Sequence, residues 1–467
     1  MSKALSFRSI FRPLVSRKAA LSFRTIFRPL VSRIARPTVI LLALLIITCN
    51  SSRAYSVLTH EEIIDLLWND HLRPMILARY PGLTDDQIRE AHAYAYGGAV
   101  IQDMGYYPFG SKEFSDLVHY VRSGDFVAEL LRESQNADEY AFALGALSHY
   151  ASDITGHPAV NEAVSLTYPK LRAKFGPIVL YAQDTTAHIR TEFGFDMAQV
   201  AKQRYAPQQY HDFIGFEVSK DLLERVFPVV YGIQLKEVLP HEDLAIGSFR
   251  YSVSSLIPHM TQVALRTHKK EIQREVPNFQ KQQFLYRLSR ADYEKQWGKN
   301  YQHPGFGVRF LAVLLRILPK IGPLKALDFN VPTAKTENMY FASINDTVEK
   351  YGALLNDTRS KHLKLPDDDL DSGHATAAGE YTLADDTYAK LLSHVADKKF
   401  NATTPALQRN ILAFYSNASA PNKTKKDPGK WQKVQTNLDA LRTFTPNPVQ
   451  PTAPKAQPTA SPTGALR

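Results

Sequence analysis

The segment SHYASDITGHP, residues 148–158, carries His149, Asp153 and His157 at a spacing of four residues. On an α-helix, residues four apart lie one turn apart on the same face. The preceding residues, DEYAFALGAL, favour a helix, which we expect to end at Gly156 and Pro158. The three side chains should therefore point toward one spot inside a helical protein.

Other candidate ligands surround this segment. TAHIRTEF, residues 186–193, repeats the four-residue step with His188 and Glu192. Segments upstream that also favour helix add His60, Asp103 and His119. Imidazole and carboxylate are the ligands that zinc takes when no thiolate is present, so eight such donors predict more than one metal ion.

A lone histidine on a helix is more often a surface residue or a hydrogen-bonded core residue than a ligand. Two four-residue pairs within forty residues, with three further donors upstream, favour a metal cluster over that simpler interpretation.

The net charge of +10 comes entirely from the N-terminal residues 1–54. Residues 1–54 hold ten Lys and Arg and no acidic residue, and without them the chain has 46 basic and 46 acidic residues. The remainder is neutral, which argues against a nucleic-acid partner.

Residues 1–54 resemble an export signal. The apolar run VILLALLII, residues 39–47, is short for a membrane span, and Ala54 ends a small-residue cleavage pattern. Cleavage after Ala54 would give a secreted or periplasmic protein that begins at Tyr55; an uncleaved signal anchor is the alternative. The only cysteine, Cys49, leaves with the signal, so histidines and carboxylates must form any metal site.

The remaining sequence predicts an all-α protein, a multi-helix bundle with an appended helical C-terminal part, because strand-type alternation is absent. Thr84 and Gln87 form an expected capping box at a helix start. We expect a leader and signal peptide (1–54), a catalytic domain (55–295), a helical C-terminal region (296–440) and a disordered tail rich in Pro, Ala and Thr (441–467).

Two C-terminal segments have alternative interpretations. Residues 307–325 have a basic face beside a broad apolar face, which suits either peripheral membrane contact or, with more support, docking on the catalytic domain. LPDDDLDSG, residues 365–373, spaces its aspartates like a calcium loop, but its glycine falls one place late. We therefore expect an acidic loop there.

The ordered set of these residues over about 55–200 resembles the zinc-dependent phospholipase C family, which is structurally related to the single-strand-specific zinc nucleases. The order is Tyr55, His60, Asp103, His119, His149, Asp153, His157, His188 and Glu192. The chain differs from the family by having Tyr55 in place of tryptophan, a shorter gap before His157 and a longer gap after it.

The resemblance implies two to three zinc ions. A first would be held by Asp103, His119, His149 and Asp153, and a second by His157, His188 and Glu192. A third would be held by His60, by Asp153 as a bridge, and by the amino and carbonyl groups of Tyr55.

The resemblance also implies an exported zinc-dependent phosphodiesterase. Its expected activity is that of a phospholipase C, which hydrolyses phospholipid headgroups with a hydroxide formed on the metal. Asp103 would be a ligand and the general base, with a purely structural ligand as the alternative. The aromatic residues Tyr94, Tyr96, Tyr106, Tyr107 and Phe109 suit a headgroup, a base or plain core packing equally well.

Two other functions remain open at this stage. One is a zinc-dependent single-strand nuclease or nucleotidase, and the other is a secreted, metal-stabilised binding protein without turnover.

Overall fold

The computed structural model describes residues 56–202, 204–205, 214–268, 270–271, 274 and 326–446. All of these lie in the second of the two units into which the chain divides, residues 49–467. This part of the chain is mainly helical, and its one sheet is a hairpin of two-residue strands. The prediction of an all-α fold is confirmed.

The first half of the described chain holds eleven helical elements in close succession. They are α2 (Val57–Leu67), the π-helix η1 (Trp68–Leu72), α3 (Arg73–Arg79), α4 (Asp85–Ala99), the 3₁₀-helix η2 (Ile101–Tyr106), α5 (Lys112–Tyr120), α6 (Ser123–Glu133), α7 (Ala137–Thr167), α8 (Pro169–Phe175), the 3₁₀-helix η3 (Tyr181–Gln183) and α9 (Thr185–Ala201).

The second half contains further helices and the hairpin. These are α11 (Lys220–Tyr231), α12 (Leu235–Val238), α13 (Glu242–Tyr251), the π-helix η5 (Ser252–Leu256), α14 (Ile257–Thr267), α19 (Ala334–Ser360), β1 (Asp368–Asp369), β2 (His374–Ala375), α20 (Thr382–Asp397), α21 (Pro405–Phe414), the 3₁₀-helix η7 (Lys423–Lys426) and α22 (Pro428–Thr443). The strands are antiparallel, with Asp368 opposite Ala375 and Asp369 opposite His374.

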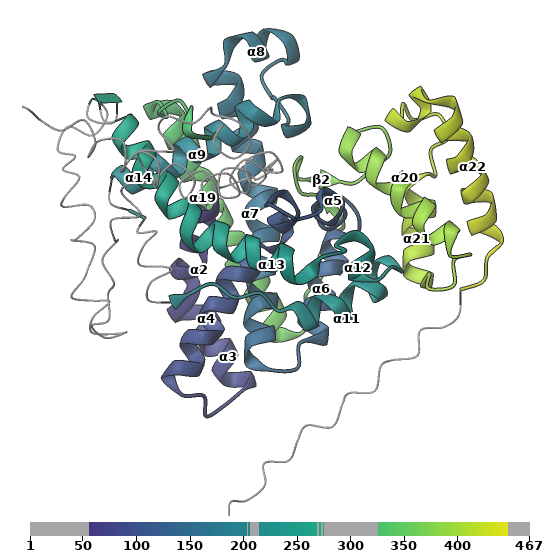
Figure 1. Ribbon diagram of the computed structural model, residues 1–467, viewed down its shortest axis with the longest axis horizontal. Coiled ribbons are helices and arrows are strands. Elements are labelled where there is room, and N and C mark those ends of the chain that lie inside the picture. Colours follow the sequence, from purple (N-terminus) through teal and green to yellow (C-terminus); the bar gives the residue numbers. More distant parts are fainter. Residues whose placement is uncertain are drawn as a thin grey trace, which may run out of the picture. The chain divides into compact units, whose positions relative to one another are not determined.

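Helix α7 is the element on which the neighbouring helices pack. It contacts α2, α4, α6, α9 and α19, and Figure 1 shows α4 and α19 beside it. Glycines allow α4 and α7 to approach closely, because a Cβ atom at Gly98 would overlap the carbonyl oxygen of Phe142 and one at Gly145 would overlap that of Ala95. This close packing brings the C-terminal end of α4 against the middle of α7. His149 lies there, one turn after Gly145.

Side-chain caps determine where α4 and α9 begin. The capping box at Thr84 and Gln87 is confirmed at the start of α4. Asp184 caps α9, where its Oδ1 accepts from the backbone N–H of Ala187 at 2.9 Å. Because a side chain of this kind satisfies a helix N–H that has no partner in the first turn, α9 begins at a defined residue.

Helix α7 is longer than predicted. The sequence predicted that it ends at Gly156 and Pro158, which is wrong, because α7 continues to Thr167. Proline at 158 has no N–H to give the carbonyl of Ile154 one turn earlier. Gly373 lies against that carbonyl with φ +73°, and a Cβ atom there would be 2.9 Å from the oxygen. The hairpin thus covers the turn at Pro158. Burial of α7 on several sides outweighs the loss of one backbone hydrogen bond there.

Several predictions fall on residues outside the described part of the chain. The leader 1–54, Tyr55, the segment 307–325 and residues 447–467 of the tail are among them. In the part that is described, none of the helices combines the length and the apolar character that crossing a membrane requires.

Candidate metal centre

Five helical elements carry the eight described candidate ligands. His60 is on α2, Asp103 on η2, His119 on α5, His149, Asp153 and His157 on α7, and His188 and Glu192 on α9. All eight are buried, and the largest exposed fraction among them is the 2% of Glu192.

Backbone carbonyls orient two of the imidazoles. Nδ1 of His119 donates to the oxygen of Ser115 at 2.7 Å, and Nδ1 of His149 donates to that of Ala99 at 2.8 Å. A carbonyl only accepts, so each Nδ1 carries a hydrogen, and in the neutral imidazole Nε2 then has the lone pair that a metal needs. Metal-binding histidines in proteins are commonly held in this way.

The carboxylate of Asp153 lies among four of the histidines. Its oxygens are 3.0 Å from Nε2 of His149, 3.4 Å from that of His119, 3.7 Å from that of His60 and 3.8 Å from that of His157. Asp103 adjoins the same group, with Oδ1 3.8 Å from Nε2 of His119. The spacing of four residues on α7 therefore places Asp153 beside both His149 on the preceding turn and His157 on the following turn, as the sequence predicted.

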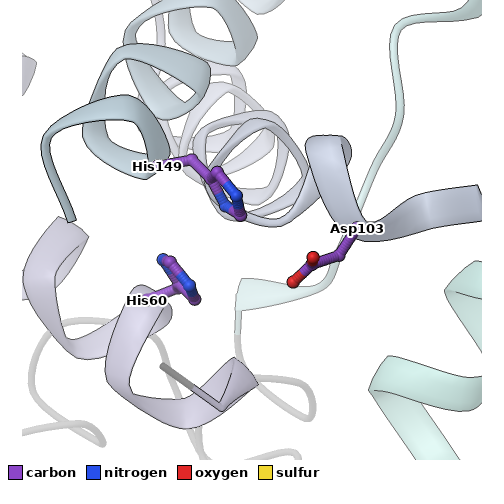
Figure 2. Close-up of side chains that lie close together, drawn as sticks. All are labelled: His60, Asp103 and His149. Atoms are coloured by element: carbon purple, nitrogen blue, oxygen red, sulfur yellow. The ribbon is translucent and has the colours of Figure 1, made fainter. Parts of the chain in front are cut away.

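His60, Asp103 and His149 point toward one another from three different elements (Figure 2). One ligand atom from each lies within 4.8 Å of the others. The rings of His60 and His149 stack with their centroids 4.5 Å apart. Because His149 also groups with His119 and Asp153, ions at the first and third expected positions would be neighbours.

His157, His188 and Glu192 form a further group with ligand atoms within 4.8 Å of one another. Nε2 of His188 is 2.8 Å from Oε1 of Glu192 on the next turn of α9. The ring centroids of His157 and His188 are 5.3 Å apart across the α7–α9 contact. His157 on α7 therefore faces the four-residue pair His188 and Glu192 on α9.

The donor set fits zinc. Zinc with bonds of about 2.0–2.2 Å in a tetrahedron holds neighbouring ligand atoms about 3.3–3.6 Å apart, and most separations around Asp153 are close to this. Among the described residues, Nε2 of His119, Nε2 of His149 and both oxygens of Asp153 are buried with no hydrogen-bond partner. Buried polar atoms in native proteins are nearly always paired, so these atoms are suited to a cation.

The cluster also has the electrostatics of a cation site. Burial alone lowers the pKa of His119, but the carboxylates of Asp153 and Asp103 raise it to about 9. Burial raises the pKa of Asp153, but His149 and His119 hold it well below its usual range. In the metal-free protein a proton on His119 therefore balances the buried carboxylate charge.

The ninth candidate, Tyr55, lies outside the described residues, but the residues that follow it are hydrogen-bonded to α9. The backbone N–H of Leu58 donates to Oδ2 of Asp196 at 3.1 Å, and the hydroxyl of Thr59 donates to Oδ1 at 2.6 Å. Asp196 belongs to α9, so the first turn of α2 is attached to the helix that carries His188 and Glu192.

The aromatic residues near Asp103 have different surroundings. The ring of Tyr106 lies 6.1 Å from that of His119, between centroids, beside the cluster. Tyr107 instead packs edge-on against Phe249, and the hydroxyl of Tyr96 donates to Asp65. Core packing therefore accounts for the last two.

Sequence reasoning missed one side chain at this cluster. Asp371, which we expected in an acidic loop, is fully buried, and its Oδ1 is 3.1 Å from Nε2 of His157. The only signal in the sequence was the unusual density of aspartates in LPDDDLDSG.

Comparison with known proteins identifies a matching family. The model of the family described as zinc dependent phospholipase C matches residues 59–240. This segment includes all eight described candidates and excludes Asp371. No curated protein and no solved structure matches the chain.

Removal of metal is expected to destabilise the fold. An ion at 100 times its Kd adds about 2.7 kcal/mol to the free energy of unfolding. The melting temperature of the purified protein should therefore fall on treatment with a chelator and recover when zinc is added, as calorimetry can measure. An unchanged melting temperature in protein shown to be metal-free would contradict a zinc-dependent core.

Zinc affinity is expected to depend on pH. His119 with a pKa of about 9 is protonated at neutral pH in the metal-free protein, and a ligand must be neutral. Zinc uptake at pH 7 should therefore release protons, and the apparent affinity should rise as the pH approaches 9. Titration calorimetry in buffers of different ionisation enthalpy measures the release; uptake without proton release at pH 7 would refute the assigned charge state.

Proposed function

We propose that this protein is an exported phospholipase C, because the model of the zinc dependent phospholipase C family, whose activity is phosphoric diester hydrolysis, matches residues 59–240. The observation that carries the proposal is the convergence of eight buried imidazole and carboxylate side chains from five helical elements inside that segment. A purely structural bundle of this size has no need for so many buried ionisable groups.

We assign the ligands by group. His119, His149, Asp153 and Asp103 would hold one zinc ion, and His157, His188 and Glu192 a second. His60, Asp153 and the N-terminal amine of Tyr55 would hold a third. His149 belongs to two of the ligand groups, and Asp153 lies among four histidines. Both observations support a compact cluster of ions.

When bound, zinc would supply Lewis acidity for the phosphoryl oxygens and activate a water molecule at neutral pH. His119 and His149 are oriented by their carbonyl partners, so little reorganisation is needed for ligand binding. Asp103, at the edge of the cluster beside His119, is the carboxylate that we assign to accept a proton from the attacking water.

A phospholipid is the substrate that the family implies. The neutral charge of residues 55–467 also favours it over a nucleic acid, whose phosphates require a basic surface. Export is proposed from the leader, since cleavage after Ala54 would create the amine that the third ion needs.

Two substitutions test the assignment of the site. His149→Ala and Glu192→Ala should each lower the hydrolysis of phosphatidylcholine by at least about 100-fold, because each removes a ligand from a different ion. Circular dichroism should show unchanged helical content, and the exposed His241 changed to Ala gives a matched control that keeps activity.

The same assays separate the competing functions. Faster cleavage of single-stranded DNA than of phosphatidylcholine would favour a nuclease. Zinc binding without hydrolysis of either substrate would favour a binding protein.

The N-terminus provides a second test. A form that begins at Tyr55 should bind one zinc ion more than a form with two extra residues, because an amide nitrogen is not a ligand as an amine is. Atomic emission spectrometry on both purified forms measures the difference. Equal zinc content and equal activity would argue against Tyr55 as a ligand.

A further inference from the structure

Asp371 lies in the turn between β1 and β2, well outside the segment that matches the family. Its side chain is fully buried next to His157. A buried carboxylate is stable only if hydrogen bonds or cations compensate its negative charge. The two oxygens of Asp371 differ in the partners that they have.

One oxygen of Asp371 is fully paired. Oδ2 accepts hydrogen bonds from the hydroxyls of Tyr120 at 2.7 Å and of Tyr381 at 2.6 Å. The backbone N–H of Asp371 donates to Asp369 at 2.9 Å, and its carbonyl accepts from Asn161 at 3.2 Å. The carboxylate is thus held in one orientation.

The other oxygen of Asp371 faces His157, one of the candidate ligands. In the described part of the chain Oδ1 has no hydrogen-bond partner, and Nε2 of His157 lies 3.1 Å from it, also without one. This separation is close to the roughly 3.3–3.6 Å between two ligands of one zinc ion.

The turn is built onto the helices that carry the candidate ligands. The backbone N–H of Leu370 donates to the carbonyl of His119 itself at 3.2 Å. The hydroxyl of Tyr150 on α7 donates to the carbonyl of Pro366 at 2.7 Å. Gly373 covers the carbonyl of Ile154 that Pro158 leaves without a helical partner. The chain after the matched segment is therefore fitted to the cluster.

Charge balance gives a further reason for a carboxylate here. A zinc ion with two neutral imidazoles and only Glu192 would keep one net positive charge in a fully buried position. A second carboxylate neutralises the group, and neutral groups are far less costly to bury than charged ones.

We propose that Oδ1 of Asp371 is a fourth protein ligand of the ion held by His157, His188 and Glu192. The inference rests on the metal centre of the proposed function. The C-terminal region would then contribute directly to the metal centre, and this ion would be bound more tightly than three ligands allow.

Zinc binding by Asp371→Asn tests the proposal, with Asp369→Asn as the matched control. Asparagine keeps an acceptor for a hydrogen bond from His157 but is a poor zinc ligand, and Asp369 is a buried neighbour at the end of β1. Compared with the wild type and the control, Asp371→Asn should lose one zinc ion or bind it at least about 10-fold more weakly in chelator competition. Its metal-free melting temperature should match that of the control.

A cobalt-loaded Asp371→Cys variant tests ligation independently of affinity. The form that begins at Tyr55 has no other cysteine, so a thiolate-to-cobalt charge-transfer band would come from residue 371 alone. A folded, cobalt-loaded variant without this band, together with unchanged zinc affinity in Asp371→Asn, would overturn the proposal. A wild-type protein that binds no zinc would instead refute the proposed function.

Discussion

The carboxylate of Asp153 lies inside the helical core, 3.0–3.8 Å from Nε2 of four histidines. A group of this kind is stable in an apolar interior only if cationic charge balances it. In the metal-free protein the raised pKa of His119 provides that balance through a proton, and zinc would provide it more completely. Much of the surrounding structure serves to hold imidazoles around this one side chain.

Close backbone contacts determine where those imidazoles lie. Gly98 and Gly145 let α4 and α7 touch, which brings the carbonyl of Ala99 to the ring of His149. At the other end of the site, Gly373 approaches the turn of α7 that Pro158 interrupts, and the same hairpin carries Asp371 to His157. Helix packing and ligand geometry therefore depend on the same few positions.

The sequence predicted the all-α fold and, through the four-residue spacing, which side chains share a helix face. Their residue types marked His60, Asp103 and His119 as further candidate donors, but which ion each would hold came only from the family resemblance, because contacts between distant segments leave no periodic signal. The continuation of α7 through Pro158 and the burial of Asp371 were not predicted, since both depend on contacts between the hairpin and helices more than two hundred residues earlier in the sequence. The domain boundaries and the ligand roles stay predictions.

A crystal structure of the zinc-loaded protein beginning at Tyr55, with anomalous scattering recorded at the zinc edge, tests the central claim most directly. We expect two to three anomalous peaks, one beside Asp153 and one bounded by His157, His188, Glu192 and Asp371. No peak within bonding distance of Asp153 in zinc-loaded protein would contradict it.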